Sequence, residues 1–197
     1  MNRRFFFIFL CLQFFAISAH AHPHIFLNNK IQVIFDHEGV SGFKAFWYAD
    51  DFSTAGLTDG YDENENGNLD DYEIKLFEKD SVNNLKKYHY FTYLKLNGKP
   101  VSLKSIEDYK VSLIDNKIVF SFFIPFKTKA KLKNTEIILS QYDKDYFSFI
   151  SFADKKPVTL VNDGNFQSYF NIEENKTETY YFGSVHPIAL ILRFKKS

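Results

Sequence analysis

The residues with the clearest chemical pattern lie at 62–73, which read Asp-Glu-Asn-Glu-Asn-Gly-Asn-Leu-Asp-Asp-Tyr-Glu. Oxygen-bearing side chains recur at alternate positions, and a glycine stands sixth, where an EF-hand loop turns sharply. Calcium takes six to eight oxygen ligands, so a tight loop of this kind can surround it. We therefore predict an EF-hand calcium site with these ligands: Asp62, Asn64, Asn66, Asn68 through its backbone carbonyl, Asp70 and the bidentate Glu73.

The predicted calcium site should be weak. Only Asp62, Asp70 and Glu73 bring full charges, and the sequence contains no second loop of this kind to pair with it. We expect a dissociation constant of about 10⁻⁴ to 10⁻³ M, the range of extracellular modules. An ordinary acidic surface loop is the alternative, but a full match to the pattern arises rarely by chance.

Residues 1–21 have the features of a secretory signal peptide. Two arginines precede an apolar run over 5–17, which is short for a membrane span, and Ala19 and Ala21 supply the small residues that a signal peptidase reads. The only cysteine, Cys11, falls inside this segment, so the mature chain could not form disulfides. We predict export to the periplasm as a soluble protein without membrane insertion.

Cleavage after Ala21 would expose a second set of metal donors. The mature chain would begin His22-Pro23-His24, with a free amine and two imidazoles within three residues. These donors suit zinc, nickel, cobalt or copper better than calcium or magnesium. We predict that His22 and His24 bind a transition metal, and His186 is the best candidate for a third ligand. The alternative is that both are only polar residues after a cleavage site.

Other polar residues are better explained by structure than by chemistry. His37 lies in an acidic turn where exposure is expected, and His89 can pack among neighbouring tyrosines. Asp50 and Asp51 are adjacent acids before a short segment that begins at Phe52, and one of them is interpreted as the cap of that segment rather than as a metal ligand. The sequence contains no catalytic motif: no nucleophile elbow, zinc-protease helix or phosphate-binding glycine loop. We therefore expect no enzyme activity.

The spacing of apolar residues predicts the elements that position these groups. Alternation and turn signals give paired strands, among them 88–96 with 100–103 around Asn97-Gly98, and 135–142 with 146–152 around the turn at 143–145. The calcium loop is followed by an amphipathic helix. We expect strands at 25–35, 40–48, 88–96, 100–103, 109–114, 117–126, 135–142, 146–152 and 185–194, a helix at 71–87, a weak entering segment at 52–61 and irregular chain at 154–174. The fold class is mainly β: a single domain over 22–197, resembling a β-sandwich, with a helical EF-hand insertion.

Charge excludes one class of partner. The whole chain balances 24 basic against 24 acidic residues, and only one arginine, Arg193, remains beyond the leader. A near-neutral chain whose lysines are scattered argues against nucleic-acid binding.

Three segments, in this order, carry a resemblance: 22–26 (His-Pro-His-Ile-Phe), 46–53 (Phe-Trp-Tyr-Ala-Asp-Asp-Phe-Ser) and the loop 62–73. The chain resembles domain-of-unknown-function family one thousand and seven, uncharacterised periplasmic components of ABC-type transport systems. The resemblance implies nickel, cobalt or zinc handling and a membrane metal transporter as partner.

We expect a periplasmic metal-binding accessory protein for divalent transition-metal uptake or delivery, with a structural calcium ion. One alternative is a copper carrier or oxidase with an N-terminal histidine site. Another is a calcium-stabilised interaction module without a transition-metal role.

Overall fold

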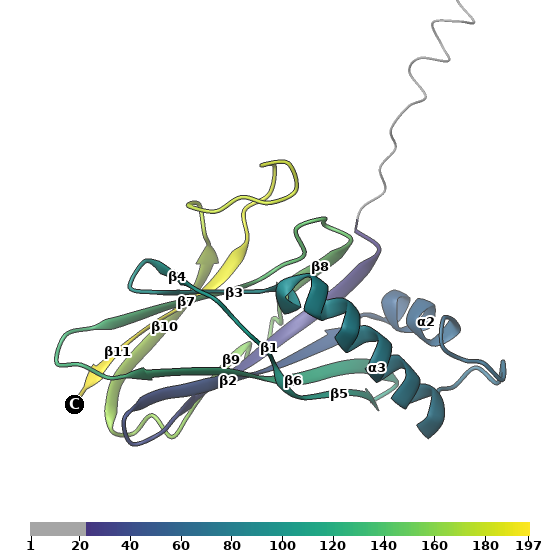
Figure 1. Cartoon of the computed structure of the whole chain (residues 1–197), viewed down its shortest axis with the longest axis horizontal. Helices are drawn as coiled ribbons and strands as arrows, with labels where there is room; N and C mark the ends of the chain where they lie inside the picture. Colours follow the sequence, from purple (N-terminus) through teal and green to yellow (C-terminus); the bar gives the residue numbers. More distant parts are fainter. Residues whose placement is uncertain (1–22) are drawn as a thin grey trace, which may run out of the picture.

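The structure is a computed structural model, and it describes residues 23–197. The predicted signal peptide and His22 lie outside the described residues. Most of the chain is β-structure in two sheets, and two helices, α2 (Asp51–Asp59) and α3 (Asp71–Lys87), stand between the second and third strands (Figure 1). The expected mainly β fold is confirmed. Within residues 23–197, no helix is long and apolar enough to cross a membrane.

The first sheet has the order β5-β6-β2-β1-β8, with β9 also paired to β1. Its strands are β1 (Ile25–Phe35), β2 (Gly39–Ala49), β5 (Glu107–Ile114), β6 (Lys117–Lys129), β8 (Ser148–Phe152) and β9 (Val158–Val161). The second sheet has the order β10-β11-β7-β3-β4. Its strands are β3 (Thr92–Leu96), β4 (Lys99–Val101), β7 (Thr135–Gln141), β10 (Phe166–Glu174) and β11 (Ile188–Lys196).

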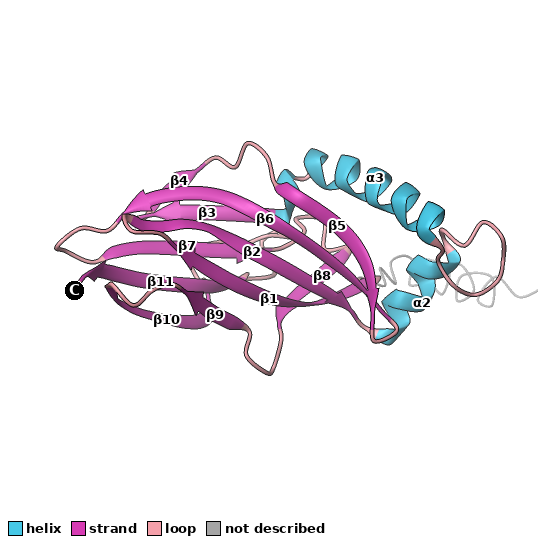
Figure 2. Cartoon of the chain, turned by 90° about the horizontal axis from the view of Figure 1, so that it is seen from below, coloured by secondary structure: helices cyan, strands magenta, loops and turns pink. Residues whose placement is uncertain are grey.

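The alternating sequence of β1 sets the interior of the first sheet. From Leu27 to Phe35 every second residue is buried, with Asn29 among them, and the alternate residues are partly or fully exposed, as expected for a strand with one face on a core. Strands of both sheets contribute to one buried cluster, and the sheets lie face to face (Figure 2). The pattern therefore predicts both the strand and its buried face.

The helices cover the end of the first sheet that the second sheet does not reach (Figure 2). Phe77 of α3 stacks on Tyr61 at 4.1 Å between ring centroids and meets Phe120 of β6 edge-on at 5.6 Å. Asp50, one of the two predicted candidates, caps α2: its Oδ1 accepts a 2.7 Å hydrogen bond from the Ser53 backbone, while Asp51 is the first residue of the helix. Aromatic packing thus fixes α3 against the sheet.

Three sequence expectations are wrong. The segment before β3 is not extended: η1 (His89–Phe91) is a 3₁₀ turn whose three residues all have φ near +50°. Strands β7 and β8 do not pair around residues 143–145; β7 pairs with β3 and β11, and β8 runs parallel to β1 in the other sheet. The stretch 154–174 is not irregular, since it contains β9 and β10.

Candidate functional site

The loop between α2 and α3 winds around the side chain of Asp62. Asp62 Oδ2 accepts a hydrogen bond from the Gly67 backbone at 2.6 Å, and Oδ1 accepts one from Asn66 at 3.1 Å. Gly67 has a φ of +80°, a conformation that glycine adopts without steric cost. The side chain of the first predicted ligand is thus hydrogen-bonded to the turn at the sixth position of the loop.

Glu73 reaches back from the first turn of α3 into the same loop. Its Oε2 accepts from the Asp70 backbone at 2.8 Å, and its Oε1 accepts from the backbone and the side-chain amide of Asn64 at 3.3 and 3.1 Å. Asp70 Oδ1 accepts in return from Glu73 N at 3.0 Å, which completes a capping box. The first and last thirds of the loop are thus joined through Glu73.

The burial of Glu73 is the observation that bears most directly on whether calcium fits the loop 62–73. Its side chain is only 1% exposed, and among residues 23–197 no lysine or arginine forms an ion pair with it. A buried carboxylate is costly unless it is paired or binds a metal. The oxygen-rich donor set suits calcium, but within the described residues no three His, Cys, Asp or Glu side chains gather closely enough to hold an ion. Binding would require Asp62, Asp70 and Glu73 to draw together.

The four histidines that the structure describes do not form a three-residue metal cluster. His24 is exposed before β1; its backbone N–H donates to Phe147 O at 2.8 Å, and its ring lies 4.9 Å from the Phe147 ring. His186 is half-buried, with Nδ1 2.7 Å from the Glu178 carbonyl oxygen. His37 and His89 are exposed. Among residues 23–197, none of these histidines belongs to a group of three or more His, Cys, Asp or Glu side chains placed to hold a metal ion.

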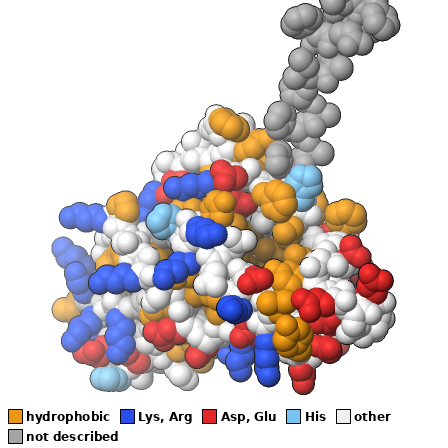
Figure 3. Space-filling model, turned by 45° about the vertical axis from the view of Figure 1, so that its right-hand side comes forward, with side chains coloured by type: hydrophobic (Ala, Val, Ile, Leu, Met, Phe, Trp, Pro, Cys, Tyr) orange, Lys and Arg blue, Asp and Glu red, His pale blue; other side chains and the backbone are white. Residues whose placement is uncertain are grey.

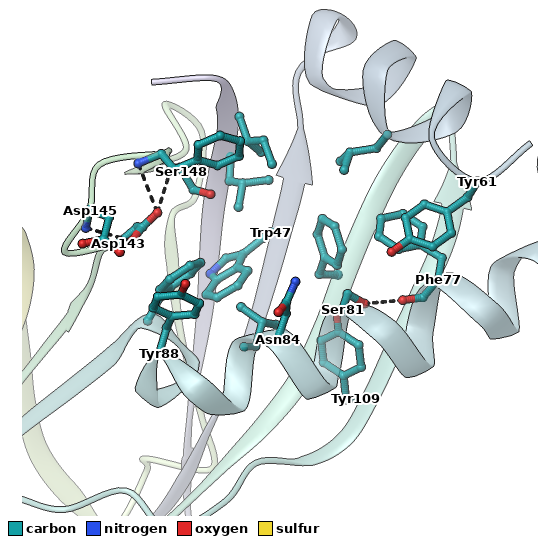
Figure 4. A pocket seen from close by; sticks show the side chains of 17 residues that line it. Trp47, Tyr61, Phe77, Ser81, Asn84, Tyr88, Tyr109, Asp143, Asp145 and Ser148 are labelled. Atoms are coloured by element: carbon teal, nitrogen blue, oxygen red, sulfur yellow. Dashed lines mark hydrogen bonds between the residues drawn. The ribbon is translucent and has the colours of Figure 1, made fainter. Parts of the chain in front are cut away.

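A cavity that sequence reasoning missed lies between α3 and the first sheet, with a volume of about 470 Å³ (Figure 4). Its lining is mainly aromatic and aliphatic, including Trp47, Phe77, Phe120 and Phe147. Ser81 and Asn84 of α3 also line it, and the Tyr109 hydroxyl donates to Ser81 Oγ at 2.8 Å. Burial raises the pKa of Tyr109 well above its usual value.

One end of the cavity is acidic. Asp143 and Asp145 both line it, from the loop between β7 and β8. Asp143 is buried, and its carboxylate accepts backbone hydrogen bonds from Asp145 at 3.0 Å, Phe147 at 3.1 Å and Ser148 at 3.0 Å. Burial, helped by the charges of Asp143 and Asp145, raises the pKa of nearby Tyr93 to about 12. The end of the cavity therefore carries a negative potential.

A buried polar network supports the cavity wall at Trp47. Trp47 Nε1 donates to Gln141 Oε1 at 3.2 Å, and Asn29 Nδ2 donates to the same oxygen at 2.7 Å. Gln141 Nε2 donates in turn to Thr92 Oγ1 at 3.0 Å. Because Gln141 belongs to β7, the network ties the two sheets together beside the cavity.

Charge is unevenly distributed on the surface. Figure 3 shows acidic side chains gathered at the helical end and lysines over the opposite side, with hydrophobic side chains between them. Glu63, Glu65 and Asp71 are exposed in or beside the loop. Such a field draws cations toward the helical end.

The only sequence signal for the cavity is on α3. Phe77, Ser81, Asn84 and Tyr88 recur at three- and four-residue intervals and line it together. Small polar residues within an apolar helical stripe indicate a face that is covered without being tightly packed. The loop carrying Asp143 has no such periodicity, because it reaches the cavity only through the crossing between sheets.

Comparison with known proteins places the chain among uncharacterised relatives. It is 32% identical over 138 residues to "Uncharacterized 15.5 kDa protein in trpE 3'region" of Spirochaeta aurantia, covering 70% of this chain and 97% of the relative. It is 25% identical over 147 residues to an uncharacterized protein of Haemophilus influenzae, covering 74% and 69%. The family model described as "Protein of unknown function (DUF1007)" matches residues 7–180. The chain therefore belongs to the DUF1007 family, as its motifs indicated.

Proposed function

We propose that this protein is a metal-binding accessory protein that acts in the periplasm, in the uptake or delivery of zinc, nickel or cobalt, and that calcium in the loop 62–73 stabilises it. The observation that carries the calcium part is Glu73: a buried carboxylate that reaches across the loop and has no cationic partner among residues 23–197. A divalent cation would offset the cost of burying that charge.

Calcium binding would act on the fold through α3. The loop ends within the first turn of this helix, and one turn further on Phe77 packs against the sheet. Drawing Asp62 and Glu73 together would fix the start of α3 relative to α2. A calcium titration by calorimetry should saturate at one ion per chain, and Glu73→Gln should remove the signal. A chain that takes up no calcium at millimolar concentration would refute this part.

The transition-metal part rests on His22 and His24 and on the family resemblance. His24 is exposed and lies immediately before β1. A membrane metal transporter is the partner this role requires.

Competitive titration tests the histidine site. Zinc, nickel, cobalt and copper are titrated into the exported protein and into a His22→Ala, His24→Ala double variant, with calcium present throughout. We expect the double variant to lose high-affinity binding, and the wild-type affinity to fall below about pH 6.5, where imidazoles protonate. Equal affinities in the two proteins would overturn the site and leave a calcium-stabilised interaction module. A strong copper preference with oxidative turnover would favour the copper carrier or oxidase.

A further inference from the structure

We propose that the cavity beneath α3 binds a small organic cation: an amine carried on an aromatic or aliphatic body. This site is distinct from both metal sites, although α3 forms one wall of the cavity and also follows the calcium loop. Its volume of about 470 Å³ falls in the range of small-molecule pockets, about 300–1,000 Å³.

The body of the ligand is specified by the apolar walls. Trp47 from β2, Phe120 from β6 and Phe77 from α3 line the cavity, with Leu27 and Leu57 beside them. Removing an aromatic or aliphatic group from water against such walls is the main source of binding free energy. The few polar groups on α3, such as Ser81 and Asn84, leave most of this surface apolar.

The charge of the ligand is specified by the acidic end. Asp143 and Asp145 line the cavity, and among residues 23–197 no lysine, arginine or histidine does. Lys144, which stands between them in sequence, lies over the Tyr93 ring at 5.2 Å from its centroid. An anion would therefore meet two carboxylates without a counter-charge, whereas an ammonium group would complement them.

Asp143 is built to receive one further donor. Its Oδ1 accepts from Asp145 N, and its Oδ2 accepts from Phe147 N and Ser148 N, so three backbone bonds hold it in place. A carboxylate offers about four acceptor positions, which leaves roughly one for a ligand. Asp145, by contrast, is exposed and adds charge at the mouth.

The arrangement along the cavity fixes how the ligand would lie. In Figure 4 the two aspartates stand at one end, Tyr61 and Phe77 stand at the other, and Trp47 lies between them. The rings of Tyr88 and Phe147, both partly exposed, also line the cavity. An ammonium group near aromatic faces gains a further favourable interaction.

The test uses three probes that share a phenyl group and a four-carbon chain and carry a positive, a neutral or a negative polar group: phenylbutylamine, phenylbutanol and phenylbutyrate. Trp47 is the only tryptophan and lines the cavity, so its fluorescence reports occupancy, and thermal stabilisation gives a second readout. Calcium is present in every sample, so failure of the calcium loop is separable from failure of the cavity. We expect saturable binding of the amine below about 1 mM, at least about tenfold tighter than that of the carboxylate.

Two pairs of variants locate the site. Asn84→Phe should fill the cavity and weaken amine binding at least about tenfold, whereas Asn83→Phe, at an exposed neighbouring position outside the cavity lining, should leave it unchanged. Asp145→Asn should weaken amine but not alcohol binding, and Asp154→Asn, exposed elsewhere, should weaken neither. Each variant is first shown to unfold cooperatively.

Three outcomes would overturn the proposal. The first is the absence of saturable amine binding. The second is equal affinity for amine and carboxylate, which would make the cavity a neutral apolar site. The third is amine binding that Asn84→Phe leaves unchanged, which would place the ligand elsewhere on the acidic surface.

Discussion

The buried network around Gln141 makes an asymmetric prediction about stability. Gln141 is 4% exposed, and its Oε1 accepts from both Asn29 Nδ2 and Trp47 Nε1. Gln141→Leu keeps the side-chain volume similar but leaves both donors without an acceptor. Each buried donor left unpaired costs about 1–3 kcal/mol, so the variant should lose about 2–6 kcal/mol of unfolding free energy.

Asn29→Leu should be far milder, although the residue is equally buried. Within residues 23–197, Asn29 Oδ1 has no hydrogen-bond partner, so removing the side chain also removes an unpaired acceptor. Gln141 Oε1 still accepts from Trp47 in this variant. We expect the unfolding free energy to change by less than about 1 kcal/mol, because the substitution also removes a buried acceptor that had no hydrogen-bond partner.

The assay is urea unfolding, followed by the fluorescence of Trp47 and by far-ultraviolet circular dichroism. A combined Asn29→Leu, Gln141→Leu variant should recover about 1–2 kcal/mol relative to Gln141→Leu, since only the indole N–H then remains unpaired. The reasoning fails if Asn29→Leu costs as much as Gln141→Leu, or if Gln141→Leu costs less than about 1 kcal/mol.

Three further predictions concern packing and titration. Phe77→Ala should lose about 3–5 kcal/mol of unfolding free energy, measured by urea unfolding. Tyr72→Ala, largely exposed on the same helix, should change it by less than about 0.5 kcal/mol. Similar losses in the two variants would contradict the packing of α3. Gly39→Ala should lose about 2 kcal/mol or more of unfolding free energy, because the new Cβ would lie 2.3 Å from a backbone oxygen of β6. Gly56→Ala, with open space around it, should gain about 0.5–1 kcal/mol. The opposite order of melting temperatures would refute this. Ultraviolet titration should find two tyrosines, Tyr93 and Tyr180, that ionise near pH 12, because burial raises both of their pKa values to about 12. Since these folded pKa values lie above the ordinary 10.0, their contribution to stability is complete below pH 10 and is lost as pH rises toward 12. Ionisation of both near pH 10 in the folded protein would contradict their burial.

Patterns within a short stretch of sequence predicted the elements whose stabilising interactions join residues close together in sequence. The alternation in β1 and the capping box between Asp70 and Glu73 are complete within a few residues, so the bounds of β1 and α3 could be predicted closely. The same holds for the turn at Asn97-Gly98, which joins β3 to β4.

Pairing between distant segments could not be predicted in this way. β7 and β8 are adjacent in sequence and flank a turn, so a hairpin was the natural expectation. Instead Asp143 accepts three backbone N–H groups inside that turn, and the chain crosses to the other sheet. The acidic end of the cavity depends on this crossing, and no periodicity in the sequence indicates it.

Thermal unfolding with and without calcium tests the calcium site most directly. For a dissociation constant of about 10⁻⁴ to 10⁻³ M, roughly 10 mM calcium should add about 1.4–2.7 kcal/mol, or about 3–10 °C in Tm. Glu73→Gln should lose this shift, while Glu63→Gln, which removes the same charge from an exposed position in the same loop, should keep it. A wild-type Tm that calcium leaves unchanged, or an equal loss of the shift in both variants, would contradict the account.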